Sequence, residues 1–188
     1  MEKRHRVFIA INPPNDVKEK LYSYSRQWPE LPAKWTAKDN LHITLEFLGN
    51  LTDEEIGNVC PIVKDVAERH NSFSLEIKQV MYGPSDKIPP KMIWAEGDKS
   101  AELAELKEDL EKSLTEKIHF APDNRTFAPH ITLARINAWE WKSIEPEDQP
   151  EIKEDIDLLF TVESIEVMES ELKREGPVYT ILESHQLK

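Results

Sequence analysis

The sequence predicts an α+β fold with antiparallel sheets. Stretches that alternate apolar and polar residues, as half-buried strands do, are mixed with amphipathic helical stretches, and strands and helices do not alternate strictly. No linker divides the 188 residues, which are enough to bury a substantial core. Cys60 is the single cysteine, so no disulfide can form within the chain, and we expect it to be a small buried residue on a helix. We therefore expect one domain over residues 1–188.

The first half of the chain predicts two strands that are each followed by a helix. Pro13 and Pro14 end the opening strand, and Gly49 ends the second strand. Thr52 and Glu55 have the spacing of a capping box, which starts the second helix. The expected elements are a strand at Val7–Ile11, a helix from Asn15 to about Trp28, a strand at Leu41–Leu48 and a helix from Thr52 to about Arg69.

The second half predicts a pair of strands, a long helix, a further strand and a closing hairpin. Alternation marks strands at Phe73–Met81 and Lys91–Glu96. Leucines spaced by three and four residues after Ser100 mark an amphipathic helix. Residues 138–154 are expected to be irregular or partly helical. The remaining expected strands are His130–Arg135, Leu158–Glu169 and Val178–Ser184, of which the last two are joined by a turn that carries Gly176.

Two of these strands share the tetrapeptide His-Ile-Thr-Leu. Because successive side chains of a strand point to opposite faces, each His and its Thr lie on one face about 7 Å apart, while Ile and Leu lie on the other. A predicted helix follows the first copy and another precedes the second, ready to cover the apolar face. Two such strands in related lobes would bring four polar side chains to one groove. These four motif residues are His42, Thr44, His130 and Thr132.

The four motif residues suit the opening of a cyclic phosphodiester. This reaction needs a base that takes a proton from the nucleophile and an acid that gives one to the leaving oxygen, and two histidines with near-neutral pKa values can do both. The threonine hydroxyls can donate hydrogen bonds to the non-bridging oxygens. No metal or other cofactor is required, and the local candidates for a stabilising cation are Arg135 and Arg125. The remaining histidines are expected to be structural or solvated: His5, His70, His119 and His185.

The net charge of −12 argues against a protein that coats long nucleic acid, because such binding depends on neutralising many phosphates. A site for one phosphate at a strand end needs only a few local donors. The N-terminal stretch is charged up to Arg6, and its apolar part, Val7–Ile11, is too short for a signal peptide or a membrane span. We therefore expect a cytoplasmic protein without a membrane partner.

At these residues the chain resembles the two-histidine (2H) phosphoesterase superfamily, and within it the RNA 2′,3′-cyclic phosphodiesterases, also described as 2′-5′ RNA ligases. The resemblance covers nearly the whole chain, although the family often has a Gly- and Phe-containing turn where this chain has Tyr82–Pro90. Trp35, Tyr82 and Phe127 could stack on a base, but aromatic residues in strands usually pack in the core. The matching segments are Arg6–Ala10, Trp35–Gly49, Met92–Trp94, Phe127–Arg135 and Ser170 to Tyr179.

The resemblance implies a bilobal α+β fold with pseudo-two-fold symmetry, in which each lobe is an antiparallel sheet backed by helices and the groove between the lobes is the active site. It also implies an enzyme that hydrolyses 2′,3′-cyclic phosphates at the ends of RNA, oligonucleotides or tRNA fragments to 2′-phosphomonoesters, with 2′-5′ ligation as the reverse chemistry. A monomer is the default expectation, because the sequence itself does not give the oligomeric state. By analogy, His42 is the general acid that protonates O3′ and His130 is the general base that activates water. Thr44 and Thr132 carry over as phosphate binders, and Arg135 as an additional electrostatic contact.

Three alternatives remain open. The first is a non-enzymatic module that binds phosphorylated RNA ends or a nucleotide in the same groove. The second, a metal-dependent phosphoesterase, would need carboxylates near the histidines; alternation places only Glu46 on the strand face of His42 and Thr44, and the second copy has Ala134 at the matching position. The third is a structural or interaction protein in which the repeat has no catalytic role.

Overall fold

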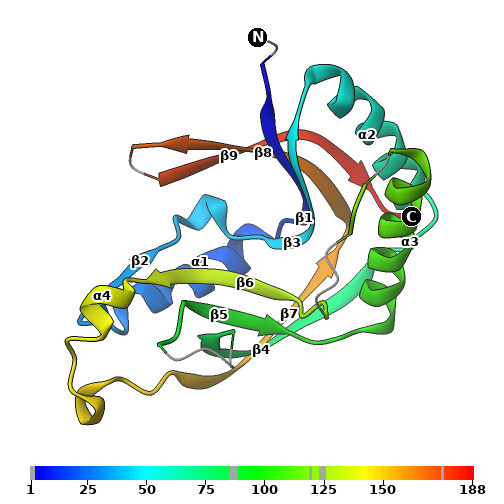
Figure 1. Cartoon of the computed structure of the whole chain (residues 1–188). Helices are drawn as coiled ribbons and strands as arrows, with labels where there is room; N and C mark the ends of the chain where they lie inside the picture. The colour runs from blue at the N-terminus through cyan, green and yellow to red at the C-terminus, as the bar shows by residue number, and fades with distance from the viewer. Residues whose placement is uncertain (1–2, 85–88, 119, 123–125, 175) are drawn as a thin grey trace.

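The computed structural model describes residues 3–84, 89–118, 120–122, 126–174 and 176–188, and within these residues nine strands form one curled antiparallel sheet (Figure 1). The strands are β1 His5–Ile11, β2 Ala33–Trp35, β3 Ile43–Leu51, β4 Phe73–Gly83, β5 Met92–Gly97, β6 His130–Ile136, β7 Lys153–Val162, β8 Ser164–Lys173 and β9 Gly176–Gln186. The helices are α1 Asn15–Ser23, α2 Asp53–Ala67, α3 Ala101–Lys117 and α4 Ala138–Trp141, with 3-10 turns η1 Tyr24–Arg26, η2 Lys38–Asn40 and η3 Pro146–Asp148.

The sheet consists of two related halves that meet at its centre. The strand order is β7-β4-β5-β6-β3-β1-β8-β9, and the short β2 pairs with β6. The two strands that carry the repeated tetrapeptide, β3 and β6, are therefore direct neighbours, and each is flanked by strands of its own half. The predicted bilobal α+β fold, with antiparallel sheet, helices against it and the motif strands where the halves meet, is confirmed.

Three helices pack on the sheet. Figure 1 shows α2 and α3 side by side, and α2 contacts β3, β8 and β9. The capping box predicted at Thr52 is present, because its hydroxyl accepts from the backbone N–H of Glu55 and the Glu55 carboxylate accepts from the backbone N–H of Thr52. Ser100 caps α3 in the same way through the N–H of Leu103. Cys60 lies buried in α2 as expected, and its burial raises the pKa of its thiol to about 11.

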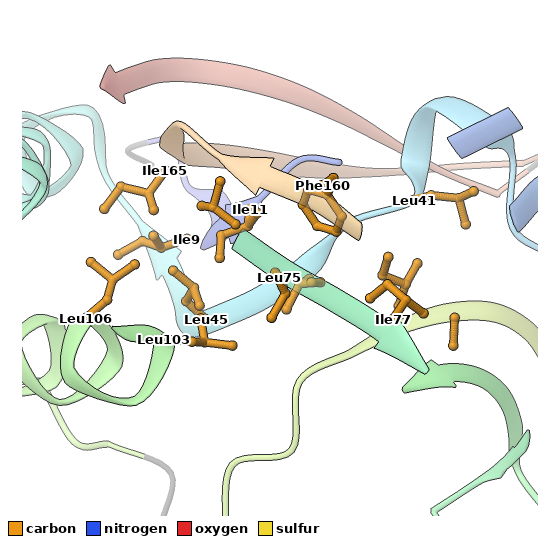
Figure 2. Close-up of a cluster of buried hydrophobic side chains, with 14 of the residues drawn as sticks. Ile9, Ile11, Leu41, Leu45, Leu75, Ile77, Leu103, Leu106, Phe160 and Ile165 are labelled. Atoms are coloured by element: carbon orange, nitrogen blue, oxygen red, sulfur yellow. The ribbon is translucent and has the colours of Figure 1, made fainter. Parts of the chain in front are cut away.

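A continuous apolar core fills the helix-bearing side of the sheet. Figure 2 shows Leu103 and Leu106 of α3 beside Leu45 of β3, with residues of β1 and β4 in the same cluster. Burial of Ile and Leu from both tetrapeptides confirms that the apolar face of each motif strand is the core face. On the opposite side a second, small cluster contains Phe8, Ala10 and Met168, with Tyr179 packed against it. This second cluster lies on the face that carries the four motif residues.

The closing part of the chain differs from the prediction. The single strand expected at Leu158–Glu169 is two strands, β7 and β8, with Glu163 between them. The chain leaves the half in which β7 pairs with β4 and enters the half in which β8 pairs with β1. The predicted final hairpin is β8 and β9. Among the described residues, no helix is long and apolar enough to cross a membrane.

Candidate active site

The register between β3 and β6 brings the two tetrapeptides together. Ile43 pairs with Ile131 in antiparallel orientation, and both side chains are buried in the core. The neighbouring positions on both strands therefore point to the other face, where the register places Thr44 beside His130 and His42 beside Thr132. All four motif residues are half-buried, as expected for side chains that line a groove.

His42 is fixed by contacts on both nitrogens. Its Nδ1 lies 2.7 Å from the backbone oxygen of Asn40, and its Nε2 lies 3.0 Å from Oγ1 of Thr44. Because a carbonyl oxygen only accepts, Nδ1 must carry a hydrogen, and the neutral ring then has its lone pair on Nε2. The rings of Phe8 and Tyr179 pack on the imidazole at centroid distances of 4.9 and 5.1 Å. Nε2 is therefore the nitrogen that can exchange a proton with a ligand.

His130 is oriented in the same way. Its Nδ1 lies 2.8 Å from the backbone oxygen of Ala128, again two residues earlier in the chain. The indole of Trp94 stacks on its ring at a centroid distance of 3.9 Å and an interplanar angle of 23°. Gly83 lies on the other side of that indole, because β4 and β6 flank β5 on opposite edges. Both histidines thus turn Nδ1 to their own backbone, which leaves Nε2 as the nitrogen for proton transfer.

Burial lowers the pKa of His42 from 6.5 to about 4. The positive charges of Lys18 and, when protonated, His130 lower this pKa further, while the Asn40 carbonyl acts in the opposite direction because it stabilises the ring N–H. His42 is therefore neutral at pH 7 in the absence of a ligand. A phosphate anion in the groove would favour the protonated ring and raise this pKa.

An irregularity in β3 corrects the predicted position of Glu46. Ala10 pairs with Thr44 but Ile9 pairs with Glu46, so Leu45 is an extra residue in β3 that shifts the alternation of side chains. Glu46 consequently shares the core face with Ile9 and is 3% exposed. Its carboxylate accepts a hydrogen bond from Lys107 of α3. The prediction that Glu46 shares the face of His42 was wrong, and Glu46 cannot join the histidines as a metal ligand.

A matching irregularity occurs in β6, where it moves Arg135 onto the groove face. Ile93 pairs with Ala134 and Trp94 with Thr132, so Leu133 is the extra residue. Arg135 therefore shares a face with Thr132, where strict alternation would have put it on the other side. It is exposed, and its guanidinium contacts the sulfur of Met92. The structure thus places Arg135 on the groove face, while Arg125 lies outside the described residues.

The aromatic residues beside the histidines are not those that the sequence singled out. Trp35, Tyr82 and Phe127 pack against the core as expected, and the Tyr82 hydroxyl donates to the backbone oxygen of Pro150 at 2.6 Å. The rings that contact the histidines are instead Phe8, Trp94 and Tyr179. Each of these three rings belongs to a segment that matches the family, and this match was the sequence signal that could have placed them at the site.

Three of the other four histidines have structural partners, as predicted. His5 is paired with Glu169 and Asp53, His70 with Asp109 and His185 with Glu183. His119 lies outside the described residues. Within the part of the chain that the structure describes, no three His, Cys, Asp or Glu side chains are grouped closely enough to hold a metal ion.

Two imidazoles and two hydroxyls on neighbouring strands, with each imidazole presenting Nε2, define a phosphoesterase of the two-histidine class. A family model described as LigT like Phosphoesterase matches the chain twice, over residues 11–94 and 96–179, and each match contains one His-x-Thr motif. The chain therefore belongs to the LigT-like phosphoesterase family.

Individual relatives agree with this membership. The RNA 2′,3′-cyclic phosphodiesterase of Thermotoga maritima is 28% identical over 183 residues, which cover 94% of this chain and 92% of that protein. The RNA 2′,3′-cyclic phosphodiesterase of Thermus thermophilus is 31% identical over 194 residues, which cover 97% of this chain and 90% of that protein. The crystal structure of TT0787 from Thermus thermophilus matches with a TM-score of 0.82, at 28% identity over 97% of both chains.

Proposed function

We propose that this chain is an RNA 2′,3′-cyclic phosphodiesterase that opens a terminal cyclic phosphate to a 2′-phosphomonoester. The observation that carries the proposal is the pairing of Ile43 with Ile131, which puts one His-x-Thr motif beside the other on one face of the sheet. The relatives from Thermotoga maritima and Thermus thermophilus that bear this name support the choice of substrate.

The proposed reaction is a metal-independent displacement at phosphorus. Nε2 of His130 takes a proton from water as the water oxygen bonds to phosphorus. The bond from phosphorus to O3′ breaks, and His42 gives its Nε2 proton to O3′. The hydroxyls of Thr44 and Thr132 donate to the non-bridging oxygens, where negative charge must be stabilised, and Arg135 adds positive charge from the same face.

The roles of the two histidines depend on the order of binding and protonation. His42 must hold a proton to act as the acid, yet its pKa is about 4 in the unliganded groove. The substrate phosphate therefore has to raise this pKa, so that protonation of His42 accompanies binding of the anion. In the reverse direction, 2′-5′ ligation, His42 and His130 exchange roles, as microscopic reversibility requires.

We further propose that residues 1–188 act as one monomeric, cytoplasmic domain on short RNA ends, including tRNA fragments. With a net charge of −12, the surface disfavours long-range attraction of polyanions. Local positive charge and hydrogen-bond donors at the groove are then the main determinants of which phosphate is bound. This combination suits a single phosphate at a chain end and gives weak binding along an RNA backbone.

The direct test is turnover of an oligonucleotide with a 2′,3′-cyclic phosphate end, in the presence of excess chelator. We expect complete conversion to the 2′-phosphate, which is distinguished from the 3′-phosphate by chromatography against both standards. Exclusive 3′-phosphate product, or loss of turnover on chelation, would refute the mechanism. Binding of the oligonucleotide without turnover would support instead a non-catalytic module that recognises RNA ends.

A further inference from the structure

A lysine from α1 reaches the end of the groove where His42 lies. The Nζ of Lys18 is 3.2 Å from the side-chain oxygen of Asn12 and 3.4 Å from the backbone oxygen of Asp39. Both partners are uncharged. Among the residues that the structure describes, no carboxylate lies within 4.0 Å of this ammonium group, although Asp39 and Glu166 are close enough to act on it electrostatically. Within that part of the chain, Lys18 is thus a half-buried cation without an ion-pair partner.

The backbone segment that Lys18 contacts is the one that orients His42. The Asp39 oxygen accepts from Lys18, and the next backbone oxygen, that of Asn40, accepts from Nδ1 of His42. Lys38 in the same turn, η2, binds Glu19 of α1 at 3.3 Å, which is a second link between α1 and this segment. The turn is therefore held from the α1 side by two lysine contacts.

The other side of η2 is tied to the closing hairpin. The Asn40 amide donates to the backbone oxygen of Pro177 at 2.7 Å, and Tyr179, two residues further on, packs edge-on against His42. Ala128, the equivalent of Asn40 beside His130, supplies a backbone oxygen but has no amide side chain to make such a tie. The two halves of the site thus differ in how firmly the orienting carbonyl is held.

We infer that Lys18 is a positioning residue for His42: it anchors the η2 segment that orients the imidazole, and it places at that end of the groove a positive charge that has no direct ion-pair partner among the described residues. The inference rests on the proposed function, since the substrate phosphate is the anion that the Lys18 charge would attract. Lys18 acts through His42 and through the field at the groove, and it takes no part in proton transfer.

The charges that face His42 agree with this role. Lys18 on α1 and His130 on β6 both oppose protonation of the ring, and the Asn40 carbonyl favours it. The remaining neighbours are the Thr44 hydroxyl on its own strand and the rings of Phe8 and Tyr179 from β1 and β9. With Lys18, and His130 when it is protonated, opposing the charge on His42, a phosphate supplies the negative charge that allows the ring to take up a proton.

The test compares Lys18→Gln with Lys18→Arg, and uses Lys20→Gln, an exposed lysine on the same helix, as the matched control. The titration of His42 is followed by NMR in the unliganded protein, and KM and kcat are measured for a 2′,3′-cyclic phosphate oligonucleotide. In Lys18→Gln we expect the midpoint of His42 to rise by about half a pH unit or more and KM to rise about fivefold or more. Lys18→Arg should restore both values toward wild type, and Lys20→Gln should change neither.

An unchanged His42 midpoint in folded Lys18→Gln overturns the inference, as does a rise in KM that Lys18→Arg fails to correct. If Lys18→Gln does not fold, Lys18→Met, which keeps the apolar stem, provides the same comparison. The NMR titration needs no turnover, so it decides the role of Lys18 even if wild-type protein proves inactive. In that case the proposed function fails and this inference is judged by the titration and by phosphate binding to the same variants.

Discussion

Replacing Gly83 by alanine should displace the His130 imidazole indirectly, through the indole of Trp94. A Cβ at Gly83 would lie 2.0 Å from Cδ2 and 2.5 Å from Cε2 and Cε3 of Trp94. Ordinary contact begins at 3.4 Å, so the indole or the strand must move by more than about 1 Å. The indole stacks on His130 on its far side, at a centroid distance of 3.9 Å. Overpacking of this kind destabilises by about 1–3 kcal/mol, and a displacement of this size at a catalytic group lowers kcat by up to about 10²-fold.

The assay pairs urea unfolding with kcat on a 2′,3′-cyclic phosphate oligonucleotide. Gly57→Ala is the matched control, because a Cβ at this position in α2 would meet nothing within 4 Å. It should leave kcat unchanged and raise stability by about 0.4–1 kcal/mol, as alanine does in a helix. Truncating the indole in the double variant Gly83→Ala/Trp94→Leu should remove the clash.

Two results would refute this reasoning. If Gly83→Ala has wild-type stability and kcat, the close approach between Gly83 and Trp94 has no energetic consequence. If stability falls while kcat is unchanged, the indole moves without carrying His130 with it. In either case Trp94 would not be a determinant of the position of that imidazole.

Three further predictions concern the site and its support. His42→Ala and His130→Ala should each lower kcat by about 10²-fold or more, with circular dichroism showing that the fold is retained. The control His70→Ala, outside the groove, should keep wild-type kcat, and wild-type turnover in both site variants would contradict the acid–base assignment. Folding lowers the pKa of His42 from 6.5 to about 4, so the unfolded chain binds this proton at a higher pH than the folded protein does, and the free energy of unfolding should fall as the pH falls from 6.5 to 4. Urea unfolding at several pH values should show a smaller decline over this range in His42→Ala. Lys107→Met should destabilise by about 3 kcal/mol in urea, because it leaves the buried Glu46 carboxylate without its cation, and a change below about 0.5 kcal/mol would contradict this.

Much of this architecture could be predicted because several local signals agreed with the packing that followed. The capping residues Thr52 and Ser100 start their helices at the expected places. The alternation in the two tetrapeptides holds over the three positions that matter, so the His and Thr side chains leave the core together. These patterns depend on short-range geometry, which the sequence expresses directly.

What could not be predicted depends on pairing between distant strands. The extra residues Leu45 and Leu133 are visible only against the registers of β1 and β5, and they decide that Glu46 enters the core while Arg135 reaches the groove. The break at Glu163 carries no Gly or Pro, so no local signal marks the point where the chain passes between halves. Likewise, no local signal identifies the Asn40 carbonyl as the acceptor for His42.

Each histidine is oriented by a carbonyl only two residues away, on its own stretch of chain. Many catalytic histidines depend on a carboxylate from a remote element, and such a pair is lost when the two elements are separated. Here the imidazole, the carbonyl that fixes its tautomer and the threonine lie within five consecutive residues, 40–44 and again 128–132. The chain carries this segment once in each half, and the pairing of β3 with β6 joins the two copies at the centre of the sheet. Each half therefore fixes the tautomer of its own histidine locally, while the pairing of β3 with β6 brings the two imidazoles to one face of the sheet.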